Sequence, residues 1–330
     1  MAQTRALLEV RDLRVSFDTP DGIVRAVRGL SFSVERGRTL AVVGESGSGK
    51  SVATQTITGL TRGATITGSA YFEGTDLITA DAATLRRLRG AEIAMIFQDP
   101  LSSLHPHYRI GWQIVEMIQA HDRQISKQAA RRRAADLLTL VGIPRAAERL
   151  DDYPHQFSGG MRQRVMIAMA MALDPALLIA DEPTTALDVT VQAQVLTVMR
   201  RLQEEFGTAI ILITHDLGVV AEMADEVIVM YAGAAMEKAP RRDIFYRNHH
   251  PYTQGLLASL PAQNSKRLTP IPGTPPSLIS LAEGCPFAAR CPHVFDRCRV
   301  ETPPLTDVFG DPRHQSACWL DHDVTEAVAS

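Results

Sequence analysis

Two nearby stretches decide the fold of this chain: Phe157-Ser158-Gly159-Gly160-Met161-Arg162-Gln163-Arg164 and, about a dozen residues later, Leu177-Leu178-Ile179-Ala180-Asp181-Glu182. The first is a Ser-Gly-Gly turn that opens a helix, and its bare backbone amides suit a phosphate group that arrives from outside. The second is a short apolar run that ends in two carboxylates, as a buried strand would. Together the two stretches predict an α/β protein that handles a phosphorylated ligand.

A complete phosphate-binding loop lies earlier in the chain, at Gly44-Glu45-Ser46-Gly47-Ser48-Gly49-Lys50-Ser51. It follows an apolar strand at Thr39–Val43 and precedes a helix at Ser51–Leu60, which is the context that such a loop requires. Its glycines let backbone N–H groups converge on the phosphates, Lys50 reaches the β- and γ-phosphates, and Ser51 binds Mg²⁺. Because the chain has its own loop, we expect the Ser-Gly-Gly turn to serve the nucleotide of a partner, which predicts a dimerising ATPase.

The two carboxylates after the apolar strand complete the predicted site. Asp181 is placed to hold Mg²⁺, through water, and Glu182 could orient or deprotonate the attacking water. The pair alone could instead cap a helix, since Pro183 follows. That alternative is weak once the phosphate loop is present.

These motifs resemble those of the ATPase subunit of an ABC transporter, and the resemblance covers Leu7 to Lys238. Three further elements of that family are found. Gln98 matches the glutamine that contacts Mg²⁺ and signals to the membrane subunits, Thr185-Ala186-Leu187-Asp188 matches the loop that crosses the dimer interface, and His215 matches the histidine that contacts the γ-phosphate. Phe17 stands where the family stacks an aromatic ring on adenine.

The resemblance implies a P-loop fold with a mostly parallel sheet, an N-terminal antiparallel part and a helical insertion. The alternation of strands and helices along the chain agrees with such a sheet, covered on both faces. We expect a nucleotide-binding domain at 1–236, with a helical subdomain at about 100–157. A small Cys-rich extension would follow at 237–330, where prolines become frequent.

One signature position departs from the commonest family pattern, which has Gln where this chain has Met161. Met lacks the hydrogen-bonding groups of an amide. Ser158, Gly159 and Gly160, which carry the phosphate contacts in the family, are intact. Met161 is usual in the branch of di- and oligopeptide importers, which also includes nickel importers.

Three strings resemble that branch: Phe97 to Leu104, Tyr153 to Met161, and His250-Pro251-Tyr252-Thr253. His105 stands where the branch more often has Asn, near the contact with the membrane subunits. The resemblance implies a second ATPase subunit, with a paralogue favoured, two transmembrane permease subunits and an extracytoplasmic solute-binding protein. Nickel or another small solute stays open as the cargo.

Four cysteines, the full complement of the chain, lie in the extension: Cys285, Cys291, Cys298 and Cys318. A disulfide framework is not expected in a cytosolic protein. The intervals of five, six and nineteen residues do not fit the close pairs of a zinc site. Irregularly spaced thiolates suit an iron–sulfur cluster better, and the resemblance implies a [4Fe–4S] cluster. Zinc and four independent thiols stay open as alternatives.

The composition excludes other classes of protein. The net charge of −3 leaves no electrostatic footprint for nucleic acid. No segment approaches the ~20 apolar residues of a membrane span, so we expect a peripheral protein at the cytoplasmic face that touches the membrane only through partners. Ser51 to Ser158 is too short for the inserts of ABC ATPases in DNA repair. A redox-sensing module in the tail is a third hypothesis.

Overall fold

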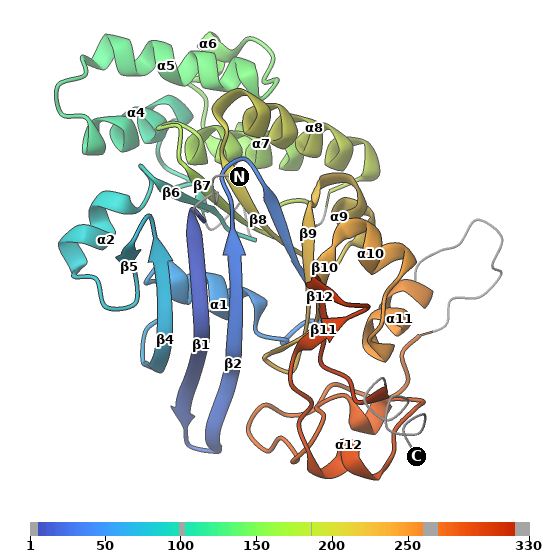
Figure 1. Ribbon diagram of the computed structural model, residues 1–330. Coiled ribbons are helices and arrows are strands. Elements are labelled where there is room, and N and C mark those ends of the chain that lie inside the picture. Colours follow the sequence, from blue (N-terminus) through green and yellow to red (C-terminus); the bar gives the residue numbers. More distant parts are fainter. Residues whose placement is uncertain (1–5, 99–102, 186, 260–269, 321–330) are drawn as a thin grey trace. The chain divides into compact units, whose positions relative to one another are not determined.

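The computed structural model describes residues 6–98, 103–185, 187–259 and 270–320. They form two compact units, each assembled from segments that lie far apart in the sequence (Figure 1). The first unit comprises the described residues up to Leu8, Ser33–Thr39 and Tyr71–Ile213, and the second comprises Glu9–Phe32, Leu40–Ala70 and the described residues from Thr214 onward. The predicted domain boundaries at 236/237 and at about 100–157 stay predictions.

The first unit is built on three parallel strands, β6 (Ile93–Ile96), β7 (Leu177–Asp181) and β8 (Ala209–Thr214). Ile93 pairs with Leu177, and Leu177 pairs with Ala209. Every residue of β7 and β8 is buried, as expected for central strands of a parallel sheet. Asp181 is thereby placed at the carboxyl end of β7.

Helices make up most of the rest of this unit. α5 packs against α4 and α7, and α7 packs against α8 and β6 (Figure 1). In α5, Ala130, Ala134 and Leu137 are buried, and their spacing places them on one face of the helix. The bounds are β5 (Thr75–Asp76), α2 (Ala82–Leu88), α4 (Ile110–His121), α5 (Lys127–Leu140), α6 (Ala146–Arg149), η1 (Pro154–Gln156), α7 (Gly159–Ala170) and α8 (Val189–Phe206).

The second unit contains the N-terminal β part and the chain's C-terminal half. β1 (Leu8–Thr19) lies between β2 (Gly22–Val34) and β4 (Ala64–Phe72). In a second layer, β3 (Thr39–Val43) pairs in parallel with β9 (Glu226–Tyr231), and β9 pairs antiparallel with β10 (Ala234–Pro240). The remaining elements are α1 (Lys50–Ile57), α9 (Leu217–Met223), α10 (Arg241–Tyr246), α11 (Pro251–Ala258), η2 (Ala288–Arg290), α12 (Asp296–Val300), β11 (Thr306–Val308) and β12 (Asp311–Ser316).

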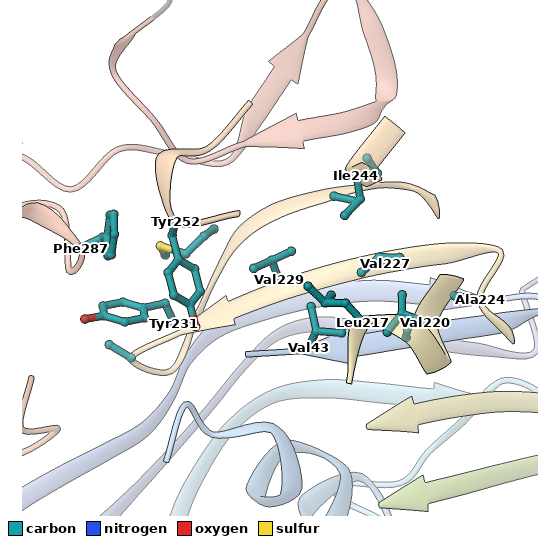
Figure 2. Packing of buried hydrophobic residues seen from close by; sticks show 14 residues of the cluster. Val43, Leu217, Val220, Ala224, Val227, Val229, Tyr231, Ile244, Tyr252 and Phe287 are labelled. Atoms are coloured by element: carbon teal, nitrogen blue, oxygen red, sulfur yellow. The ribbon is translucent and has the colours of Figure 1, made fainter. Parts of the chain in front are cut away.

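The C-terminal region is part of this sheet and of its core. β10 crosses the position where the sequence predicts the extension to begin, and β12 pairs with β10 through Glu237 and Ser316. Phe287 of the Cys-rich segment packs on Tyr231 and Tyr252, in a hydrophobic cluster that also holds Val229 (Figure 2). The tail therefore shares one apolar core with the strand that precedes the phosphate loop.

A buried polar network ties these pieces together. Glu237 in β10 is 0% exposed, and its carboxylate accepts hydrogen bonds from the backbone N–H groups of His249 (2.7 Å) and His250 (3.0 Å). His314 in β12 places Nε2 2.8 Å from the same carboxylate. A buried carboxylate needs such donors, because leaving it without them costs more than each bond contributes.

Burial lowers the pKa of His250 from its ordinary 6.5 to about 4, and the charge of Glu237 opposes this shift only in part, while His249 adds to it. His250 Nδ1 accepts a hydrogen bond from the Tyr252 N–H at 3.0 Å, which requires that nitrogen to be unprotonated. The unfolded chain, with the higher pKa, binds this proton more readily than the folded chain. The stabilising effect of neutral His250 is therefore present above pH 6.5 and is lost as the pH falls toward 4.

We expect the free energy of unfolding to fall by about 2 kcal/mol between pH 7 and pH 5 through this group. Urea denaturation at both pH values measures it. His250→Asn keeps a side-chain acceptor at the start of α11 but does not titrate, so the variant should be less stable at pH 7 and show a shallower pH dependence. An identical pH dependence in both proteins would contradict this account.

Candidate nucleotide site

The phosphate loop lies in the second unit, between the end of β3 at Val43 and the start of α1 at Lys50. Gly44 has φ +154° and Gly49 has φ +97°. A Cβ atom at Gly44 would lie 2.1 Å from the Met230 carbonyl oxygen, and one at Gly49 would lie 2.2 Å from that of Ala26. Neither position has room for a side chain, because neighbouring backbone comes this close to the loop.

The side chain of Lys50 is enclosed by its own loop. Its ammonium donates to the carbonyl oxygens of Gly44 (2.8 Å) and Glu45 (2.9 Å) and lies 3.3 Å from Ser48 Oγ. Lys50 is 6% exposed, and Ser51, which follows it, is half-buried. A curled loop with glycines at its tight points and an enclosed ammonium fits the phosphates of a nucleotide, and the Ser51 hydroxyl offers oxygen to Mg²⁺.

The first unit brings the predicted carboxylate and glutamine together. Asp181 at the end of β7 is 3% exposed. Glu182 follows with φ +48°, in the left-handed region that a non-glycine residue seldom adopts. Its carboxylate accepts hydrogen bonds from Gln98 Nε2 (2.9 Å) and from Thr185 Oγ1 (2.8 Å), and its backbone N–H donates to Ile213 O (2.9 Å).

The Ser-Gly-Gly turn forms the start of α7, also in the first unit. Ser158 caps the helix, with Oγ accepting from the Met161 N–H at 3.3 Å, and both Ser158 and Gly159 are exposed. Gly160 faces α8, where a Cβ atom would lie 2.4 Å from Val191 Cγ1. The second glycine is therefore required by helix packing, and the first leaves open space at the helix start.

The other predicted residues are divided between the two units. Asp188 caps α8, with Oδ1 accepting from the Val191 N–H at 3.0 Å. His215 in the second unit is exposed and lies between β8 and α9, and Phe17 in β1 is half-buried. Residues 99–102 of the Phe97 to Leu104 string and Ala186 of the interface loop lie outside the described residues.

Sequence reasoning missed several residues that contact these motifs. Thr185 supplies a hydroxyl to Glu182, although its string was read only as part of an interface loop. Tyr252 Oη accepts from the Glu45 N–H at 3.0 Å, and Arg290 forms an ion pair with the Glu45 carboxylate. The distances along the chain, of about 200 residues or more, left no local signal for these two contacts.

The four cysteines lie near one another in the second unit. The Cys285 N–H donates to the Cys298 carbonyl at 2.8 Å, and the charges of the other three thiols contribute to raising the pKa of Cys318. Burial is the larger cause, and it raises the pKa of Cys285 to about 11 and that of Cys318 to about 12. Among the described residues, no three or more His, Cys, Asp or Glu side chains are arranged to hold a metal ion.

Two known protein families match parts of this chain. The model of the family "ABC transporter" matches residues 27–185, and that of "Oligopeptide/dipeptide transporter, C-terminal region" matches 236–298. The chain is 51% identical to the dipeptide transport ATP-binding protein DppD of Bacillus subtilis, over 98% of each protein. The chain belongs to the ABC transporter family.

A second relative and a solved structure are ATP-binding proteins as well. It is 52% identical to the oligopeptide transport ATP-binding protein OppD of Mycobacterium tuberculosis over 94% of its own length, but it spans only 51% of that longer protein. A solved dimeric ATP-binding cassette in a post-hydrolysis state, bound to ADP and Pi, matches 71% of this chain and 99% of its own at 25% identity, with a TM-score of 0.65. The predicted P-loop fold and the ATP-hydrolysing activity are confirmed.

The described residues of this ABC ATPase include no helix that is long and apolar enough to cross a lipid bilayer.

The loop geometry predicts unequal effects of two glycine substitutions. A Cβ atom at Gly47 would meet nothing within 4 Å, so Gly47→Ala costs only the ~1–2 kcal/mol of a left-handed alanine. Gly49→Ala adds a clash with the Ala26 carbonyl. We expect Mg-ADP affinity to fall at least about tenfold for Gly49→Ala and about threefold or less for Gly47→Ala. Titration calorimetry measures both, and equal losses would contradict the steric argument.

Proposed function

We propose that this ABC ATPase couples ATP binding and hydrolysis to the uptake of di- and oligopeptides. The observation that carries the proposal is about 50% identity over nearly the whole chain to proteins named for dipeptide and oligopeptide transport. Residues 236–298 also match the family model for the C-terminal region of such transporters. Nickel or another small solute is the alternative cargo, and a non-transport ABC ATPase is the alternative class.

The proposed roles divide into binding and chemistry. Lys50 and the amides of residues 44–51 hold the phosphates, and Phe17 stacks on adenine. Ser51, Gln98 and Asp181 supply oxygen ligands for Mg²⁺, which neutralises phosphate charge when it is bound. Glu182 positions the attacking water and accepts its proton, and His215 contacts the γ-phosphate. The hydrogen bonds from Gln98 and Thr185 to the Glu182 carboxylate support this role, because they fix its orientation.

The second nucleotide contact comes from a second subunit in this proposal. Ser158, Gly159, Gly160 and Met161 of one subunit cover the nucleotide that is held by the loop of the other, together with Asp188. The exposed start of α7, with open space at Gly159, supports this role because an anion can approach a helix start that lies at the surface. We propose a paralogous ATPase as the second subunit.

The remaining partners follow from the transporter assignment. Two transmembrane permease subunits provide the pathway, and an extracytoplasmic solute-binding protein delivers the cargo. The ATPase is then peripheral, at the cytoplasmic face of the membrane. Closing and reopening of the ATPase dimer passes to the permeases through the Gln98 segment and the helices from α4 to α6.

The cargo and the catalytic role can be tested together in the reconstituted transporter, with its binding protein supplied empty, loaded with a dipeptide or loaded with nickel. We expect the dipeptide-loaded form alone to stimulate ATP hydrolysis. Glu182→Gln should lower hydrolysis at least about 100-fold, because a general base is lost.

Glu204→Gln is the matched control, since Glu204 lies exposed on α8 of the same unit. It should hydrolyse ATP as the unaltered protein does. Stimulation by nickel in place of peptide would overturn the cargo, and full activity of Glu182→Gln would overturn the base.

For the four cysteines we propose a [4Fe–4S] cluster, with zinc as the alternative metal. Their confinement to one segment supports it. The thiols are not arranged as a metal site in this structure, so cluster binding requires them to move closer together. It also requires them to lose their protons, which burial opposes by raising the pKa of Cys285.

Anaerobic purification followed by analysis of iron, acid-labile sulfide and zinc tests this proposal. We expect about four iron and four sulfide per chain, and substitution of Cys298 by Ser should lower both. Protein that is colourless and free of iron after anaerobic work would overturn the cluster, and one zinc per chain would identify the alternative.

A further inference from the structure

The phosphate loop carries a negative charge of its own. Glu45 is its second residue, and the Lys50 ammonium donates to the Glu45 carbonyl oxygen at 2.9 Å. The carboxylate therefore belongs to the same residue whose backbone contacts the phosphate-binding lysine. A nucleotide brings several negative charges to this loop, so an uncompensated carboxylate here opposes binding.

One guanidinium compensates that charge. Arg290 Nη1 donates to Glu45 Oε2 at 2.7 Å and Nη2 donates to Oε1 at 3.0 Å, a two-point contact that suits the planar groups. The side chain of Arg290 is 6% exposed and that of Glu45 is 25% exposed. A pair this sheltered is screened less by salt than a surface pair.

Three further hydrogen bonds hold the guanidinium in place. Its Nε donates to Pro272 O at 2.8 Å, Nη1 also donates to Tyr231 Oη at 3.2 Å, and Nη2 also donates to Ile271 O at 3.4 Å. These bonds and the two to Glu45 engage all five donors of an arginine. Lysine, with three donors on a flexible stem, cannot reproduce the arrangement.

The position of Arg290 is set by the Cys-rich segment. It ends η2, which lies between Cys285 and Cys291. The Ala288 N–H donates to the Cys285 carbonyl at 3.0 Å, and Phe287 fills the apolar core beside Tyr231 (Figure 2). The segment that carries the cysteines thus delivers the counter-ion of the phosphate loop.

We propose that Arg290 is a positioning residue for the phosphate loop, which neutralises and orients Glu45 so that the loop accepts the nucleotide's phosphates. The Cys-rich tail then takes part in nucleotide affinity and is more than an appendage to the ATPase. The proposal concerns nucleotide binding by the full chain and does not depend on the cargo.

The test is the affinity of the full-length chain for Mg-ADP, measured by titration calorimetry at fixed salt. Arg290→Ala should weaken binding about tenfold, because it leaves the Glu45 carboxylate unpaired next to the phosphates. Glu45→Gln should bind as tightly as the unaltered protein or tighter. The double variant Glu45→Gln/Arg290→Ala should recover to within about threefold, since the offending charge is gone.

Arg313→Ala is the matched control. Arg313 makes a similar two-point contact with Asp311 in β12, but its side chain is 69% exposed and has no contact with the loop. It should leave Mg-ADP affinity unchanged. Arg290→Lys should show an intermediate loss, because it keeps the charge without the planar fork.

Three results would overturn the proposal. The first is an Arg290→Ala protein that binds Mg-ADP within twofold of the unaltered protein. The second is a folded double variant that binds no better than Arg290→Ala, which would mark the ion pair as a structural staple only. The third is weaker binding of Mg-ADP by Glu45→Gln, which contradicts the charge argument. This variant can be measured even if Arg290→Ala fails to fold.

Discussion

The carboxylate of Glu237 is completely buried, and it has to be satisfied by hydrogen-bond donors from the surrounding chain. The donors are backbone groups of the turn before α11 and the imidazole of His314 in β12. This constraint orders the C-terminal half of the second unit, because α11 then presents Tyr252 to the Glu45 N–H. The shape of the phosphate loop therefore rests on residues that are about 200 positions away from it in the sequence.

The predicted nucleotide-binding and catalytic groups of this ABC ATPase are divided between the two units. The second unit holds an anion-binding loop with its lysine, and the first unit holds the acidic end of β7 and the start of α7. Glu182 follows β7 in a strained conformation, and its side chain is held by Gln98 and Thr185. Strain of about 1–3 kcal/mol persists only where the surrounding structure enforces it, which is typical of residues under functional constraint.

Local patterns in the sequence predicted part of the fold. The strand Thr39–Val43 appears with the predicted bounds, and the apolar run that begins at Leu177 forms β7, because each is a continuous apolar run. β10 was missed, since it is the strand Ala234-Ala235-Met236-Glu237-Lys238-Ala239-Pro240, whose glutamate, lysine and proline are poor strand formers. Its burial pattern follows from the tertiary partners of Glu237, which periodicity does not encode.

For the candidate site, too, local sequence patterns identify residues only where a motif is present. The phosphate loop, Glu182 and Gln98 were singled out by motifs with fixed spacing or by a family pattern, but the hydrogen bond between Glu182 and Gln98 was not predicted. Arg290 has neither, because its function depends on the fold of a loop-rich segment that returns to β3 and β9. In that segment the cysteines form a pattern that indicates a metal site, but no local pattern marks Arg290 as a contact of the phosphate loop.

The pairing of β10 with β12 has a consequence for synthesis of the chain. β10 leaves the ribosome well before β12, so until the last strands emerge one of its edges presents unpaired N–H and C=O groups. An open edge of this kind is a template for pairing with another nascent chain. Truncated chains that stop before Asp311 would keep that edge of β10 unpaired. Aggregation of such chains would then affect the cell before the loss of their ATPase activity did.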